Sequence, residues 1–179
     1  RAHLKLGWEC YFDGDLDAAR QHAEWTVERA EECSRRFEVL EGLRLKALVQ
    51  QSMGTDGSTE LLASVRKKAA AHGHVAIEAR AVNCLGDAAR FDGRLEKARH
   101  HYRQFLSKTE ELCRPIPRTS AELNLAQIEL RTGDFERAAA LASEARERLA
   151  TLGAGNHRRG IVHGIRLGLV CLGCCWALM

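Results

Sequence analysis

The chain has 179 residues, of which 45% are hydrophobic and 28% are charged, a normal soluble composition. The formal net charge is only +3, and acidic and basic residues alternate along the sequence without forming a polybasic face. This balance argues against nucleic acid or an anionic membrane as the main partner.

Helical periodicity runs along most of the chain. Apolar residues at alternating steps of three and four mark one face of an α-helix, and the abundant Ala, Leu, Arg and Glu favour helix. In chain order the pattern predicts helices over 1–13, 15–34, 36–53, 58–72, 75–91, 94–113, 119–132 and 134–152, with a further helix from about 156 to the end. We call the first helix of each successive pair helix A and the second helix B.

Three of the B helices share one apolar register, and the corresponding residues lie 79 and 40 positions apart. The register consists of Leu16, Ala19, Ala23, Thr26, Ala30 and Cys33; then Leu95, Ala98, Tyr102, Phe105, Thr109 and Leu112; then Phe135, Ala138, Ala142, Ala145, Leu149 and Leu152. A rhythm that returns every 39–40 residues predicts a stacked helical repeat with these positions, Cys33 included, in its core.

Glycines mark the predicted turn inside each pair. Gly14, Gly54, Gly93 and Gly133 are 39 or 40 residues apart, and Gly173 follows at the same interval. Glycine suits the left-handed conformation that closes a helix C-terminus. Asp15 and Asp134, which follow two of these glycines, are predicted to cap the next helix and to meet its positive N-terminal dipole.

The A helices carry a mark of their own. Leucine or isoleucine recurs every 39 or 40 residues at Leu6, Leu45, Leu85, Leu125 and Ile165. A small residue follows three of them, as Gly7, Gly86 and Ala126, and is predicted to let helix B approach closely. Lys46 and Arg166 break this rule, so we expect the second and fifth repeats to pack differently or to be shifted by a residue.

The two prolines of the chain lie together between the third and fourth pairs. Pro115 and Pro117 are expected to end the third B helix. Thr119 and Glu122 fit a capping box, which predicts that the next helix begins near 119.

The residues Leu85-Gly86, Gly93, Ala98 and Tyr102 resemble the tetratricopeptide repeat (TPR) signature, in which Leu-Gly in the first helix is paired with an alanine and an aromatic in the second. The resemblance implies an all-α fold, a right-handed α-solenoid of about four and a half repeats. Their expected bounds are 1–34, 35–73, 74–114, 115–153 and a partial 154–179. The period exceeds the family's usual length of about 34, and arrays of this longer kind are similar to those in large bacterial signalling proteins, beside a kinase or a transcription regulator. Because the first residue is Arg1, we expect the chain to be a fragment of a longer protein.

In such arrays the A helices line a concave groove that holds a partner. Polar and aromatic side chains form a second stripe along the predicted A helices, where they could grip a peptide backbone or a carboxylate. The candidates are Trp8, Tyr11, Arg44, Gln51, Arg80, Asn83, Asp87, Arg90, Asn124, Gln127, Arg131 and His163. The alternative is that these residues are an ordinary solvated face, with Trp8 in the core.

Neither the histidines nor the cysteines predict a metal site or a cofactor. His72, His74, His100 and His101 lack a clear third and fourth ligand and are interpreted as surface residues. The seven cysteines are Cys10, Cys33, Cys84, Cys113, Cys171, Cys174 and Cys175, which we interpret as buried apolar residues in a reducing cytoplasm, without disulfides.

The sequence contains no phosphate-binding loop, zinc-protease motif or serine elbow, so no catalytic residues are predicted. The leading hypothesis is a non-enzymatic module that binds a protein or peptide, or a neighbouring domain of the same chain. A structural or oligomerisation array is the first alternative, since the uncharged segment 167–179 could drive self-association. A ligand sensor that controls an attached kinase or transcription regulator is the second.

Overall fold

The computed structural model describes residues 2–112 and 115–153, and all the regular structure in those two ranges is helical. The helices are α1 (Ala2–Asp13), α2 (Leu16–Glu32), α3 (Arg36–Ser52), α4 (Ser58–Ala71), α5 (Val75–Phe91), α6 (Leu95–Glu111), α7 (Pro115–Thr132) and α8 (Phe135–Gly153). The bounds confirm the predicted helices to within a few residues at most ends. The predicted fifth A helix, with Ile165, Arg166 and Gly173, lies outside the described residues.

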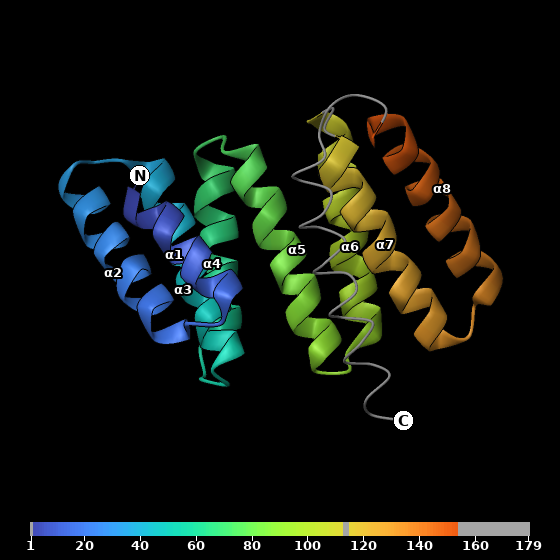
Figure 1. Ribbon diagram of the computed structural model, residues 1–179, viewed down its shortest axis with the longest axis horizontal. Coiled ribbons are helices and arrows are strands. Elements are labelled where there is room, and N and C mark those ends of the chain that lie inside the picture. The colour runs from blue at the N-terminus through green and yellow to red at the C-terminus, as the bar shows by residue number, and fades with distance from the viewer. Residues whose placement is uncertain (1, 113–114, 154–179) are drawn as a thin grey trace.

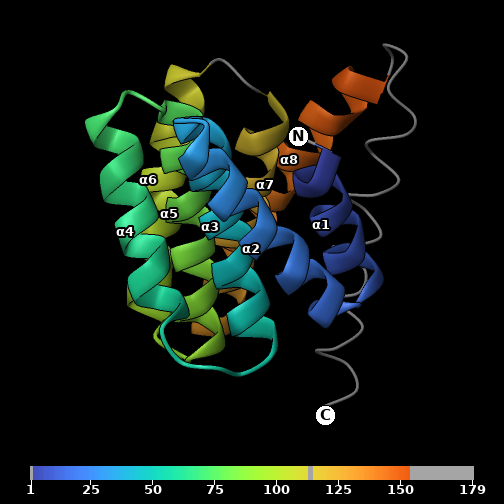
Figure 2. The same ribbon diagram turned by 90° about the vertical axis from the view of Figure 1, so that its left-hand side faces the viewer.

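Consecutive helices pack side by side, so the described part of the chain forms an array of four helical hairpins (Figure 1). The A helices α1, α3, α5 and α7 alternate with the B helices α2, α4, α6 and α8. Along the array, α3 also contacts both α1 and α5. Figure 2 shows the array from its N-terminal end, with α2 and α3 in front of the later pairs.

The predicted turn chemistry is confirmed. Gly14, Gly93 and Gly133 have φ of 86°, 72° and 87°, a region that favours glycine. The Asp15 carboxylate accepts a hydrogen bond from the Ala18 backbone N–H at 3.0 Å, and Asp134 accepts one from Arg137 at 3.1 Å. These caps satisfy donors that the first turn of a helix leaves without partners.

Small residues permit close helix approach where the sequence predicts it. A Cβ on Gly86 would lie 2.6 Å from the ring of Tyr102 on α6, and a Cβ on Gly7 would lie 2.7 Å from Leu45. The second repeat differs, because Lys46 reaches out to Glu24 at 3.2 Å. There the close contact is made by Gly42, which lies one helical turn before Lys46. A Cβ added to Gly42 would lie 2.9 Å from Val27.

The recurring leucines of the A helices pack into the pair that precedes them. Leu45, Leu85 and Leu125 are 0%, 6% and 5% exposed. Leu45 packs against Ala19 and Ala23 of the first pair. The corresponding Leu6 is 43% exposed, since no helix pair precedes it in the described part of the chain.

The apolar register of the B helices is confirmed at the centre of α2 and of α6, and it is wrong at Cys33, Phe135 and Ala142. Ala19, Ala23, Thr26 and Ala30 are buried in α2, as are Ala98, Tyr102, Phe105 and Thr109 in α6. Cys33, predicted in the core, is exposed because α2 ends at Glu32 and Cys33 is its C-cap. Ala142 is exposed and Phe135 is 66% exposed, since no described helix covers the outer side of α8.

The predicted start of the seventh helix is also wrong. The helix begins at Pro115, because the first turn tolerates prolines that lack an N–H donor. Thr119 and Glu122 therefore lie inside α7 and are 3% and 1% exposed, so they form no capping box. The Glu122 carboxylate instead meets Arg118 at 3.0 Å and Arg148 of α8 at 2.9 Å.

A second buried carboxylate on α7 ties the last two pairs together. Glu129 is 3% exposed and accepts hydrogen bonds from Arg99 of α6 at 2.7 and 3.1 Å. Arg137 of α8 lies 3.7 Å from it. Two guanidiniums therefore compensate the cost of burying this charge, and loss of either would leave it poorly paired.

The interpretation of His101 as a surface residue is wrong, whereas its neighbour His100 is exposed. His101 is 8% exposed, and its Nδ1 is buried without a hydrogen-bond partner. Burial lowers its pKa, and the charges of His100, Lys97 and Arg66 lower it further.

We predict that Leu85→Ala destabilises the protein by about 2–5 kcal/mol, because it opens a cavity between two repeats. Leu6→Ala is the matched control and should cost less than about 1 kcal/mol, since much of that side chain is already in water. Urea denaturation followed by circular dichroism measures both. Equal losses would contradict the packing of each leucine into the preceding pair.

We also predict that His101 makes stability depend on pH. Because its pKa is lowered in the folded state, protonation favours unfolding, and the stabilisation present above about pH 6.5 should be lost as the pH falls below it. The His101→Gln variant should lose less stability than wild type between pH 7.5 and 5.5, by at most about 1.4 kcal/mol per pH unit. The control His100→Gln should keep most of the wild-type dependence, and a wild-type slope in His101→Gln would contradict the assignment.

Candidate functional site

Eleven of the twelve candidate residues lie on α1, α3, α5 and α7, and His163 lies outside the described residues. We call these eleven residues the A-helix surface: Trp8, Tyr11, Arg44, Gln51, Arg80, Asn83, Asp87, Arg90, Asn124, Gln127 and Arg131. Most of them contact a candidate on the same or the adjacent A helix. The structure therefore places residues from four repeats in one row.

Aromatic contacts join the first two A helices. The Arg44 guanidinium of α3 lies over the ring of Trp8 of α1, 4.4 Å from its centroid. The Trp8 and Tyr11 rings meet edge to face at 5.9 Å, and the Tyr11 hydroxyl lies 3.3 Å from the Ser52 hydroxyl of α3. Trp8 is thus half-buried and forms part of the surface as well as a border of the core.

Glu41, which is not among the predicted residues, joins the second and third A helices. Its carboxylate is 3% exposed and receives Arg44 at 2.7 Å and Arg80 of α5 at 2.6 Å. The sequence carried a signal for the first pair, since Glu41 and Arg44 are three residues apart on one helix face. The second pair spans 39 residues, close to the repeat interval, and connects two repeats.

A buried network holds the centre of α5. The Tyr102 hydroxyl of α6 donates to Asp87 at 2.7 Å and accepts from Arg90 at 3.2 Å. Asn83 donates to Asp87 at 3.2 Å and accepts from Asn124 of α7 at 2.9 Å. These bonds fix the side chains and join α5 to α7.

Burial also alters the ionisation of this network. Burial raises the pKa of Asp87, and the hydrogen bond from Tyr102 and the charge of Arg90 offset part of that rise. Burial and the Asp87 carboxylate raise the pKa of Tyr102 well above its usual range, so its hydroxyl remains a donor at neutral pH.

The remaining candidates differ in how firmly they are held. Arg131 is exposed, and its guanidinium donates to the Arg90 backbone carbonyl at 3.5 Å. Gln127 is half-buried. Gln51 is half-buried too, and its side-chain oxygen has no hydrogen-bond partner.

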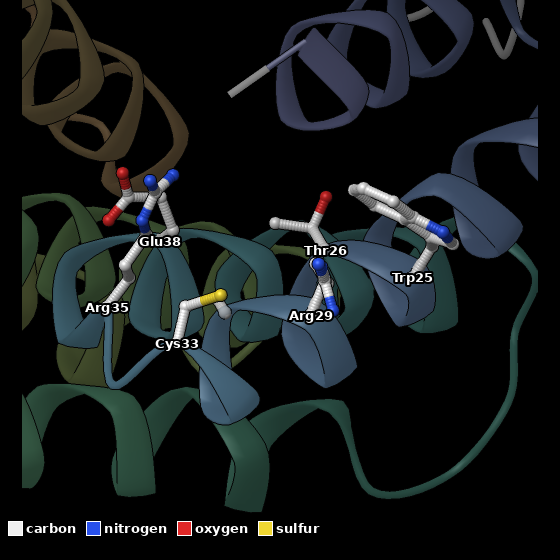
Figure 3. Close-up of a pocket in the computed structure, with 7 residues that line it drawn as sticks. Trp25, Thr26, Arg29, Cys33, Arg35 and Glu38 are labelled. Atoms are coloured by element: carbon white, nitrogen blue, oxygen red, sulfur yellow. The ribbon is translucent and has the colours of Figure 1, made fainter.

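Two cavities open beside the junctions between repeats. The first, of about 260 Å³, lies between α2 and the start of α3 and is lined by Trp25, Thr26, Arg29, Ala30, Cys33, Arg35 and Glu38. Figure 3 shows Trp25 and Thr26 at one end of this cavity and Arg35 and Glu38 at the other. The second, of about 230 Å³, is lined by Ala76, Ala79, Arg80, Asn83, Phe105, Thr109, Leu112, Pro117 and Ser120. It includes two residues of the A-helix surface, Arg80 and Asn83.

The described cysteines have contrasting environments. Burial raises the pKa of the Cys84 thiol to about 11, although the nearby Arg44 guanidinium acts in the opposite direction. Cys33 is exposed and Cys10 is half-buried. Cys113, Cys171, Cys174 and Cys175 lie outside the described residues.

Within residues 2–112 and 115–153, no three His, Cys, Asp or Glu side chains come together in a way that could hold a metal ion. In the same ranges, every helix is too short or too polar to cross a bilayer.

Comparison with known proteins identifies the fold. No family model matches the chain, and no curated protein matches it. Among solved structures, BtubC (BKLC) from P. vanneervenii is 17% identical with a TM-score of 0.71, covering 88% of this chain and 65% of that one. Aspartyl phosphate phosphatase F from Bacillus subtilis is 15% identical with a TM-score of 0.76, over 84% of this chain and 40% of its own.

A third similar structure is itself a set of TPR-like repeats. The TPR-like repeats of a putative kinesin light chain from Podosopora anserina are 18% identical with a TM-score of 0.66, covering 89% of this chain and 77% of that one. The chain spans less than two thirds of the length of BtubC and of the phosphatase. The fold is a TPR-like helical repeat array, as the sequence predicted.

We predict that alkylation separates the two kinds of cysteine. At pH 8 the raised pKa of Cys84 reduces its thiolate fraction by about 100-fold relative to an ordinary thiol, and burial also blocks access. Iodoacetamide should therefore modify Cys33 at least about 100-fold faster than Cys84, as measured by mass spectrometry of each cysteine peptide. In urea the two rates should converge, and similar rates in the native protein would contradict the burial of Cys84.

Proposed function

We propose that the chain is a non-catalytic module of a larger regulatory or signalling protein and binds a protein or peptide across the A-helix surface. The observation that carries the proposal is the row of contacts from Trp8 on α1 to Arg131 on α7. Four repeats contribute to one polar and aromatic surface, which is the arrangement that an extended partner needs.

The internal bonds of the surface favour binding, because they fix the side chains before a partner arrives. A side chain that is already ordered loses little entropy on binding. Arg80 shows the principle, since one of its nitrogens is held by Glu41 while 40% of its side chain remains exposed. A guanidinium has five N–H donors, so Arg80 can bind Glu41 and still donate to a peptide carbonyl or carboxylate.

Some residues of the A-helix surface hold neighbouring helices together, so a smaller set of residues is proposed to bind the partner. Asp87 and Arg90 meet the buried Tyr102 and hold α5 against α6. The side chains on α7 are better placed to contact a partner, because Asn124 and Gln127 are half-buried and Arg131 is exposed. None of these three pairs with a buried carboxylate of the described chain.

A structural or oligomerisation array is the second candidate. Phe91, Leu130 and Phe135 are 68%, 53% and 66% exposed, and all three lie close to the turns inside the third and fourth pairs. Light scattering distinguishes this candidate, because it requires a mass that rises with protein concentration and falls when these residues are replaced by serine.

We predict that the triple variant Asn124→Ala, Gln127→Ala, Arg131→Ala binds peptides at least tenfold more weakly than wild type. The peptides are those selected from a phage-displayed random library on residues 1–179, and fluorescence anisotropy gives the dissociation constants. The variant removes directed donors from α7 without removing a core side chain, so its melting temperature should stay close to that of wild type.

The control replaces Gln21, Lys67 and Arg103 by alanine, three polar residues that are exposed and lie on the B helices. This control should bind the selected peptides as wild type does. If the two variants weaken binding equally, or neither does, the A-helix surface is not where partners bind.

A further inference from the structure

The two cavities occupy the same place in the repeat. Thr26, Ala30, Cys33 and Glu38 of the first cavity correspond to Phe105, Thr109, Leu112 and Pro117 of the second, and each pair is 79 residues apart. Both cavities therefore open where a B helix ends and the next A helix begins. This position recurs in every repeat, so the intermediate repeat shows what can occupy it.

In the second repeat, the chain's own apolar side chains occupy this position. Val65, Ala69 and Ile77 correspond to Phe105, Thr109 and Pro117, each 40 residues earlier. Leu40 corresponds to Arg80 at the same interval, and Leu40 and Ile77 are 3% and 0% exposed. Leu40, Val65, Ala69 and Ile77 pack together as one buried cluster.

Different residues stand at these positions beside the open cavities. In the third repeat, Arg80 replaces the aliphatic Leu40 and Pro117 replaces Ile77, which leaves about 230 Å³. In the first repeat, Glu38 stands where the second repeat has Ile77, beside a cavity of about 260 Å³. Each cavity thus lies at the position where the second repeat places an aliphatic side chain.

We propose that the first and third cavities each accept one aliphatic side chain of a single extended acidic peptide, which passes over the filled position in the second repeat. The proposal rests on the proposed function and specifies the chemistry of the partner, which would meet the A-helix surface at Arg80 and Asn83 of the second cavity. We choose aliphatic anchors because Leu40 and Ile77 already place aliphatic side chains at the equivalent position of the second repeat.

Charge favours acidic residues beside the two aliphatic anchors. Arg29 and Arg35 line the first cavity together with one carboxylate, Glu38. Arg80 lines the second cavity, where no lining residue is acidic, and it also binds Glu41 outside the lining at 2.6 Å while 40% of its side chain stays exposed. Arg29 also binds Glu32 at 2.5 Å outside the lining. A peptide carboxylate near either cavity therefore meets an arginine.

The geometry also sets the spacing of the anchors. Adjacent packed helices are about 8–10 Å apart, so two steps along the A helices span about 16–20 Å. An extended chain advances about 3.3 Å per residue. The two aliphatic side chains should therefore be about five or six residues apart in the peptide.

The test uses fluorescein-labelled peptides with two leucines in a background of glutamate and serine, the leucines lying three to eight residues apart. Fluorescence anisotropy with residues 1–179 should show an affinity maximum at a separation of five or six residues. Replacement of either leucine by serine should weaken binding at least tenfold. The proposal is overturned if the affinity does not change with the separation of the leucines, or if no peptide of the set binds.

Variants that fill one cavity test the sites separately. Ala76→Leu places an aliphatic group in the second cavity, and Cys33→Trp places a large one in the first; Ala76→Ser and Cys33→Ser are the matched controls. Each filling variant should abolish the advantage of one leucine over serine, whereas the controls should retain it. If both filling variants bind as wild type does, the cavities hold no anchor.

A second measurement needs no substitution in the protein. Photo-leucine at the two anchor positions should cross-link to 25–38 and to 76–83 or 105–120, as mapped by peptide mass spectrometry. Cross-links confined to other segments overturn the proposal. The phage-selected peptides distinguish the two proposals. If they lose affinity for the Asn124, Gln127 and Arg131 triple variant but bind both filling variants as they bind wild type, the proposed function stands and the two-cavity inference is rejected.

Discussion

The fold depends on one packing constraint, which is that no helix pair can bury its apolar face by itself. The next A helix covers that face with a leucine, as Leu45 does for the first pair and Leu125 for the third. Because each leucine must reach the same place on the preceding pair, the repeat interval stays at 39 or 40 residues. The turn glycines Gly14, Gly54, Gly93 and Gly133 follow the same interval, since each must keep its place relative to that leucine.

Local periodicity was sufficient to predict the helices, their pairing and the centre of each apolar register. It failed where burial depends on whether a neighbouring element is present. Leu6 has the same pattern as the buried Leu45 and Leu85, and Phe135 the same as the half-buried Leu16 and Leu95, yet both are exposed because no described helix covers them. Pro115 was misread for a different reason, because proline ends a helix and also begins one, and the sequence does not show which of these applies.

The candidate site was predicted in part. Helical spacing identified the polar residues of the A-helix surface, because it depends only on residues within one helix. It did not identify Glu41 or Tyr102 as their partners, since Glu41 binds Arg80 39 residues away and Tyr102 binds Asp87 15 residues away. The cavities were missed for a related reason. They lie beside Pro117 and Glu38, where the second repeat has the branched aliphatic Ile77, and this difference shows only when the repeats are compared in register.

The carboxylates buried between repeats give the array a mechanical property. Glu41 and Glu129 each hold arginines from two helices, and Glu129 joins α6 and α8 across α7. Stretching the array would pull guanidinium groups from carboxylates that have little access to water, and that separation is costly. The described helices should therefore resist extension, so that the distance between the first and the last of them changes little.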